Sequence, residues 1–163
     1  MACRILVVVG TRPEAVKLAP VVHALRREAW ANCRVLAVAQ HRELLDRTLA
    51  FFGIVPDADL DLMRPGQGLA DLTARAIAAI DPVLVEEEPD LVIAQGDTTT
   101  VLVAALCAFY RAIRFAHVEA GLRTGDLAQP FPEEGNRSLV ARLARWHFAP
   151  TPAAAANLRR EGI

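Results

Sequence analysis

The sequence predicts an α/β domain in which a parallel sheet carries helices on both faces. Apolar β runs and helical patterns alternate along the chain, and the first run, residues 4–9, is almost continuously apolar. A strand that is buried on both faces has such a run, and repeated β-α units form parallel sheets. The chain has 163 residues, of which 53% are hydrophobic, so we expect a single domain over residues 1–163 with a substantial core.

Short apolar runs that end at polar or turn residues mark the expected strands. These strands cover residues 4–9, 34–39, 58–62, 90–94, 114–118 and 146–150. Segments whose apolar residues recur at helical spacing lie between them. The expected helices cover residues 13–27, 44–52, 69–84, 98–110 and 132–144, with a last helix from 152 onward. Pro13 suits the first turn of its helix, whereas Pro20 is expected to kink it.

The composition excludes several classes of function. The net charge of −1 gives no general attraction to nucleic acid or to an anionic membrane. The longest apolar stretch, residues 101–110, is far shorter than the ~20 residues of a transmembrane helix, and the first apolar run is too short for a secretory signal. The three cysteines form no CxxC pair, which indicates reduced core cysteines rather than disulfides or zinc ligands. We therefore expect a cytoplasmic protein without a metal.

Polar clusters follow four of the expected strands. They are residues 10–14, 40–42, 95–100 and 119–124. In parallel sheets of this kind, ligands bind outside the carboxyl ends of the strands, so the four clusters are expected to meet at one edge. Two of their residues have simple local interpretations: Glu14 complements the dipole at a helix start, and His41 forms local hydrogen bonds.

Three carboxylates and two arginines are the main candidates for chemistry at this edge. They are Asp97, Glu119 and Glu133, with Arg12 and Arg137. Reactions on sugars often use carboxylates in different environments as base and as acid, while phosphate groups favour arginine and helix N-termini. We expect Arg12 to lie beside the carboxylates of the fourth and fifth strands. The residues alone indicate an acid-rich crevice framed by arginines and leave its substrate open.

Each carboxylate also has a purely structural interpretation. Asp97 or the adjacent Thr98 suits the N-cap of the following helix. Glu119 suits a structural salt bridge near the core. Glu133 stands four residues before Arg137, a spacing that favours an intrahelical ion pair.

Six motifs, taken together, point to a known family. They are GTRPEAVKLAPVVHAL, AQHRELLD, PGQGLADLT, GDTTT, FAHVEAGLRTGD and PFPEEGNR, in this order. From Ile5 to the end of the chain, the sequence closely resembles the amino-terminal half of the non-hydrolysing UDP-N-acetylglucosamine 2-epimerases. That resemblance implies one Rossmann-like half of a two-domain, GT-B-type architecture, in which the substrate binds between the domains.

The resemblance also implies a reaction. Members of that family interconvert UDP-N-acetylglucosamine and UDP-N-acetylmannosamine by removing the C2 proton and expelling UDP, which later adds back with the opposite configuration at C2. The implied small-molecule partner is UDP-N-acetylglucosamine, and no cofactor is required. This agrees with the lack of a GxGxxG dinucleotide motif.

The resemblance assigns roles to individual residues. The acid/base residues would be Asp97, Glu119 and Glu133, without deciding which of them takes the C2 proton. The expected substrate-binding residues are Arg12, Lys17 and Arg137, and we add His41 to them. Gln40 and Gln67 match positions of a second, regulatory UDP-N-acetylglucosamine site in bacterial members.

Several features depart from the family pattern. Gln95 replaces a common histidine, Gly135 lies inside a helix, and Gly66 replaces a basic residue in some members, which puts regulation in doubt. The family continues beyond this length into a carboxy-terminal nucleotide-binding domain, which carries a catalytic histidine. We expect residues 1–163 to need that domain as a partner and to be inactive without it.

Other interpretations remain open at this point. The same motifs suit a hydrolysing relative or another GT-B sugar-nucleotide enzyme. A non-catalytic module is a further alternative. Such a module would bind a sugar nucleotide or form a homodimer through an apolar helix such as 101–110.

Overall fold

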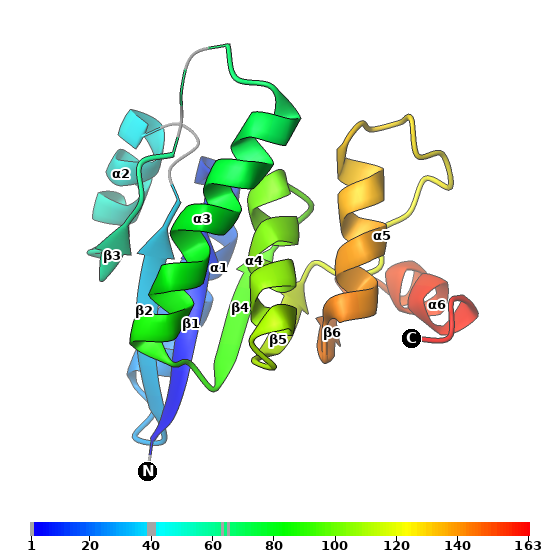
Figure 1. Cartoon of the computed structure of the whole chain (residues 1–163). Helices are drawn as coiled ribbons and strands as arrows, with labels where there is room; N and C mark the ends of the chain where they lie inside the picture. Colours follow the sequence, from blue (N-terminus) through cyan, green and yellow to red (C-terminus); the bar gives the residue numbers. More distant parts are fainter. Residues whose placement is uncertain (1, 39–41, 63, 65) are drawn as a thin grey trace.

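The computed structural model describes residues 2–38, 42–62, 64 and 66–163, and its six strands form one parallel sheet (Figure 1). The strands are β1 (Cys3–Val9), β2 (Ala31–Ala37), β3 (Ala58–Asp59), β4 (Leu91–Gln95), β5 (Arg114–Val118) and β6 (Trp146–Phe148). Their order is β3-β2-β1-β4-β5-β6, and every neighbouring pair is parallel. This is the order of doubly wound nucleotide-binding folds, in which the direction of winding reverses between β1 and β4. The predicted parallel α/β sheet is confirmed.

Helices cover both faces of the sheet, as predicted. They are α1 (Arg12–Arg26), α2 (Arg42–Phe51), α3 (Leu69–Glu87), α4 (Thr99–Tyr110), α5 (Glu133–Leu143) and α6 (Pro152–Arg160). Figure 1 shows α3 and α4 in front of the sheet and α1 behind it. Among the described residues, no helix is long and apolar enough to cross a membrane.

Strand β1 supplies both hydrophobic cores because its successive side chains point to opposite faces. Leu6 and Val8 belong to the core under α3, α4 and α5, whereas Ile5, Val7 and Val9 belong to the core under α1 and α2. All five side chains are at most 2% exposed. This explains why the sequence of this strand is apolar without alternation.

Some elements differ from the expected boundaries. Strand β2 begins at Ala31, not at 34, because the backbone of residues 31–33 pairs with β1 although these residues do not form an apolar run. Strand β3 has only two residues, and β6 ends at Phe148, before Pro150. Helix α1 includes Pro20, which lies on its exposed side.

The cysteines are free thiols, as the spacing predicted. Cys33 and Cys107 are buried and Cys3 is partly buried. Burial raises the pKa of the Cys107 thiol to about 11, so this residue behaves as a small apolar side chain of the core.

An apolar groove of about 510 Å³ lies on the α1 side of strands β4, β5 and β6. Its lining includes Val21 and Leu25 of α1, together with Val118, Trp146 and Phe148. Trp146 remains 41% exposed and Phe148 57% exposed. This part of the sheet therefore presents apolar side chains to solvent, although parallel sheets are normally buried on both faces.

Gly121 allows α6 to pack directly on the turn after β5. Its φ is +88°, and a Cβ atom built on it would lie 2.3 Å from the carbonyl oxygen of Ala154 in α6. The side-chain amide of Asn157 donates to the Gly121 carbonyl oxygen at 2.9 Å. Only glycine fits both the backbone conformation and this close approach.

We expect Gly121→Ala to lower the free energy of unfolding by roughly 2–4 kcal/mol, because the new methyl group adds backbone strain and a steric clash. Gly135→Ala is the matched control. Gly135 lies inside α5 with no atom near its Cβ position, so alanine should leave stability unchanged or raise it by up to about 1 kcal/mol. Urea denaturation of the two variants measures both effects, and equal stabilities would contradict this account of Gly121.

Candidate active site

The buried side chain of Glu14 closes the turn between β1 and α1. Its Oε2 atom accepts hydrogen bonds from the backbone N–H groups of Gly10 (2.5 Å) and Thr11 (3.0 Å). The Thr11 hydroxyl in turn accepts from the Glu14 N–H, which completes a capping box at the start of α1. The prediction of Glu14 as a helix-start residue is confirmed. In a dinucleotide-binding fold, N–H groups at this turn would face a pyrophosphate.

The same carboxylate reaches the loop after β4. The Thr98 hydroxyl donates to Oε1 of Glu14 at 2.9 Å, and its oxygen also caps α4 by accepting from the N–H of Val101. Glu14 is only 3% exposed. Burial raises the pKa of Glu14, and these hydrogen bonds partly oppose the rise. Because Thr98 is the N-cap, the side chain of Asp97 is not used for capping.

Asp97 is held by α5 at two points. Its Oδ2 atom lies 2.7 Å from Nη2 of Arg137, whose side chain is 11% exposed. The side-chain amide of Asn136 donates to the backbone carbonyl oxygen of Asp97 at 2.8 Å. Helix α5 therefore fixes both the backbone and the carboxylate of Asp97.

The pKa of Asp97 is raised above its ordinary value. Burial is the largest cause, and the nearby charges of Glu133 and Glu119 add to it, while the Arg137 guanidinium opposes it. The three candidate carboxylates, which follow β4, follow β5 and begin α5, are thus close enough for their charges to influence one another.

Glu119 follows β5 in a strained backbone conformation. Its φ is +67°, a value that costs a residue other than glycine about 1–3 kcal/mol. Its carboxylate forms an ion pair of 2.5 Å with Lys17 of α1. This ion pair agrees with the structural interpretation of Glu119, while the strained backbone is a feature that clusters at functional sites.

Glu133 has a different environment. Among the described residues, its carboxylate has no hydrogen bond or ion pair, and only its backbone carbonyl accepts from Nε of Arg137 at 3.3 Å. The expected ion pair between Glu133 and Arg137 is not formed, because Arg137 is turned toward Asp97 and Glu134.

The remaining candidates form no ion pair with these carboxylates among the described residues, or lie outside those residues. Arg12 is exposed, has no ion pair among the described residues and lines a hollow between α1 and α2, so its expected position beside the carboxylates stays a prediction. The Oε1 atom of Gln67 accepts from the Arg64 N–H at 3.1 Å and from the Arg75 guanidinium. Gln40 and His41 lie outside the described residues.

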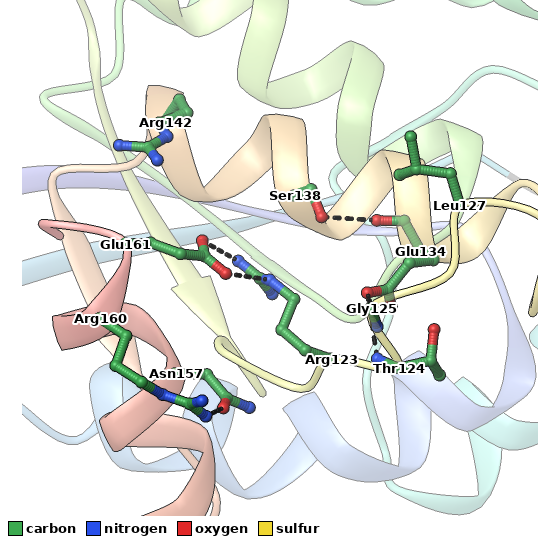
Figure 2. Close-up of a pocket in the computed structure, with 10 residues that line it drawn as sticks. All are labelled: Arg123, Thr124, Gly125, Leu127, Glu134, Ser138, Arg142, Asn157, Arg160 and Glu161. Atoms are coloured by element: carbon green, nitrogen blue, oxygen red, sulfur yellow. Dashed lines mark hydrogen bonds and ion pairs between the residues drawn. The ribbon is translucent and has the colours of Figure 1, made fainter.

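Sequence reasoning missed Glu134 and Asn136, which are 2% and 6% exposed. The Oε1 atom of Glu134 accepts from the backbone N–H groups of Thr124 and Gly125 (Figure 2). Glu134 precedes the buried Ala141 by seven residues, or two helical turns, and this spacing was a signal that its side chain points inward.

His117 supports the loop that carries Asp97. It is fully buried, and its Nε2 atom is 2.7 Å from the carbonyl oxygen of Gly96. Burial lowers its pKa to about 4, so the ring is neutral near pH 7 and donates this hydrogen bond. No group of metal-ligating side chains occurs within the described residues.

Comparison with known proteins gives a consistent result. The sequence profile of the family described as UDP-N-acetylglucosamine 2-epimerase matches residues 23–163. The Escherichia coli K12 protein named UDP-N-acetylglucosamine 2-epimerase is 52% identical over 160 residues, which cover 98% of this chain and 43% of that protein.

Solved structures show the same relation. A Neisseria meningitidis UDP-GlcNAc 2-epimerase has a TM-score of 0.95 at 47% identity, covering 98% of this chain and 43% of its own. The Methanocaldococcus jannaschii enzyme has a TM-score of 0.92 at 36% identity, covering 98% and 44%. The chain thus spans less than half the length of these relatives.

The raised pKa of Glu14 gives a testable dependence of stability on pH. The folded state binds the Glu14 proton more tightly than the unfolded chain does, so this group stabilises the protein below its ordinary pKa of 4.5, and its contribution is lost as the pH rises through the raised value. Glutamine cannot ionise and keeps an oxygen for the two N–H groups. We expect the free energy of unfolding, measured by urea denaturation, to fall less from pH 4 to pH 8 in Glu14→Gln than in the wild type.

Glu86→Gln is the control. Glu86 lies at an exposed position of α3, so this variant should lose as much stability between the two pH values as the wild type does. Equal losses in all three proteins would contradict the assignment.

Proposed function

Because the chain belongs to the UDP-N-acetylglucosamine 2-epimerase family, we propose that it supplies the acid/base half of an enzyme that interconverts UDP-N-acetylglucosamine and UDP-N-acetylmannosamine. The observation that supports this proposal most directly is the group formed by Asp97, Glu119 and Glu133. Asp97 pairs with Arg137, Glu119 pairs with Lys17, and Glu133 has no side-chain partner among the described residues. Carboxylates in such different settings suit different steps of acid/base catalysis.

The proposed reaction proceeds by elimination and re-addition. A carboxylate takes the C2 proton, the C–H electron pair forms a C1–C2 double bond, and the C1–O bond breaks as UDP leaves with its electrons. UDP then attacks C1 again while C2 receives a proton on its opposite face. Inversion at C2 requires proton transfer on both faces of the sugar, and one carboxylate cannot reach both without a large movement.

The cations of the group have a proposed role in binding. Lys17 and Arg137 orient Glu119 and Asp97, and their positive charge favours the developing charge on the departing diphosphate. Arg12 lies at the first turn of α1 and faces an open hollow of about 310 Å³, and we assign it to substrate binding at the rim of the site. His41 keeps its proposed substrate-binding role on resemblance alone.

The proposed substrate is UDP-N-acetylglucosamine. The Neisseria meningitidis relative was solved bound to UDP-GlcNAc and the Methanocaldococcus jannaschii relative in complex with UDP-GlcNAc and UDP. Since the chain covers about 43% of such proteins, we propose that most uridine and diphosphate contacts come from the part of the family that residues 1–163 do not include. A regulatory role for Gln40 and Gln67 would use the same ligand.

The reaction can be tested in the complete polypeptide that carries this chain. With UDP-N-acetylglucosamine in deuterated water, we expect deuterium at C2 of both isomers, because the C2 proton exchanges with solvent through the catalytic carboxylates. Asp97→Asn, Glu119→Gln and Glu133→Gln should each lower turnover by at least about 100-fold. Mass spectrometry and NMR of the sugar nucleotides measure both quantities. Glu86→Gln should match the wild type, and turnover without deuterium at C2 would sink the elimination mechanism.

Residues 1–163 alone should show no turnover of UDP-N-acetylglucosamine above background, because the carboxylates would lack the groups that hold the diphosphate. The same assay, run at equal molar concentration with the complete polypeptide as the positive control, measures this. A normal rate for the 163-residue chain would contradict the proposal that the groups holding the diphosphate lie outside residues 1–163.

A further inference from the structure

We propose that Glu134 is a positioning residue, whose carboxylate fixes both the turn after β5 and the Arg137 guanidinium that holds Asp97. This inference rests on the proposed function in giving Asp97 and Arg137 a role in catalysis. Glu134 itself contacts Arg137 and acts on Asp97 only through it. Its two oxygens face different partners, and each contact can be tested separately.

One oxygen of Glu134 holds the turn. Oε1 lies 3.0 Å from the backbone nitrogens of both Thr124 and Gly125, which donate to it (Figure 2). The side chain is 2% exposed, so these two charge-assisted hydrogen bonds are shielded from water. They fix the segment that leads from Glu119 toward α5.

The other oxygen faces Arg137. Oε2 is buried, has no hydrogen-bond partner and lies 3.5 Å from Nε of Arg137. The Nη2 atom of the same guanidinium forms the 2.7 Å contact with Asp97. A buried carboxylate requires a compensating cation, so the position of Arg137 is set by two anions and by the Glu133 carbonyl oxygen, which accepts from Nε at 3.3 Å.

The other cationic side chains around Glu134 either pair with another residue or are exposed to solvent. Arg123 forms two contacts with Glu161, of 2.8 and 2.9 Å. Arg142 is exposed at the edge of a hollow of about 580 Å³ that Glu134 also lines, and Arg160 is exposed and bonds to Asn157. Arg137 is therefore the cation that pairs with Glu134.

Glu133 provides a matched control for these contacts. It precedes Glu134 directly, but successive residues of a helix point about 100° apart. Its carboxylate has no hydrogen bond or ion pair among the described residues. Glutamine at position 133 therefore changes the same charge on the same helical turn and keeps the backbone carbonyl oxygen that accepts from Arg137, so the turn after β5 and the guanidinium retain their contacts.

The first arm of the test uses NMR of residues 1–163 and needs no turnover. Glu134→Gln keeps an oxygen for Thr124 and Gly125 but places an NH₂ group beside Nε of Arg137, where two donors oppose each other. We expect the exchange of the two backbone amide protons to stay within about threefold of wild type. The Arg137 side-chain Nε–H should exchange at least about tenfold faster, because a displaced guanidinium also loses its hydrogen bond to the Glu133 carbonyl oxygen. Glu134→Ala should accelerate both, and Glu133→Gln neither. An unchanged Arg137 signal in Glu134→Gln would overturn the proposal.

The second arm measures kinetics in the complete polypeptide. We expect Glu134→Gln to lower kcat by roughly 10–100-fold and to change KM by less than about threefold, because a displaced guanidinium misplaces Asp97 without removing a substrate contact. A role confined to folding would lower the yield of folded protein and leave kcat per folded molecule unchanged, and that result would also overturn the proposal. If the wild type shows no epimerisation, the proposed function fails, and the NMR arm alone decides whether Glu134 positions Arg137.

Discussion

The buried carboxylate of Glu14 is the contact on which the arrangement of the site depends. It bonds to the N–H groups of Gly10 and Thr11 and to the Thr98 hydroxyl, and so joins the ends of β1 and β4. These are the two strands between which the winding of the sheet reverses, where such folds form their ligand crevice. The side chain of Glu14 thus takes the first two N–H groups of this turn. These N–H groups are therefore already occupied and do not face a dinucleotide phosphate.

The charges of the crevice are balanced across elements that are far apart in the sequence. Lys17 comes from α1 and pairs with Glu119 after β5, while Arg137 comes from α5 and pairs with Asp97 after β4. The negative charges of Glu119 and Glu133 raise the pKa of Asp97, and the Arg137 guanidinium opposes that effect. The packing of α1 and α5 on opposite faces of the sheet therefore has an electrostatic consequence at its edge.

The spacing of apolar residues predicted the helices and strands well, because burial of one face sets that spacing. Contacts between side chains of different elements leave no comparable pattern in the sequence. Strand β5 was predicted at its observed bounds, whereas the start of β2 depends on backbone pairing with β1, to which residues 31–33 give no apolar pattern. Asp97 and Arg137 were both identified as candidates, yet their pairing became visible only in the structure. Glu133 and Glu134 are identical residues in sequence, and only the rotation of α5 decides which carboxylate is buried.

The groove beside β6 bears on how a chain of these residues behaves in concentrated solution. Trp146 and Phe148 give it an apolar surface, and a net charge of −1 supplies almost no repulsion between molecules. Exposed apolar side chains at this sheet edge favour association between molecules, and their contacts with solvent do not involve the packing of the two cores. The same sheet thus supplies buried side chains to the cores and, at its β6 edge, exposed ones to solvent.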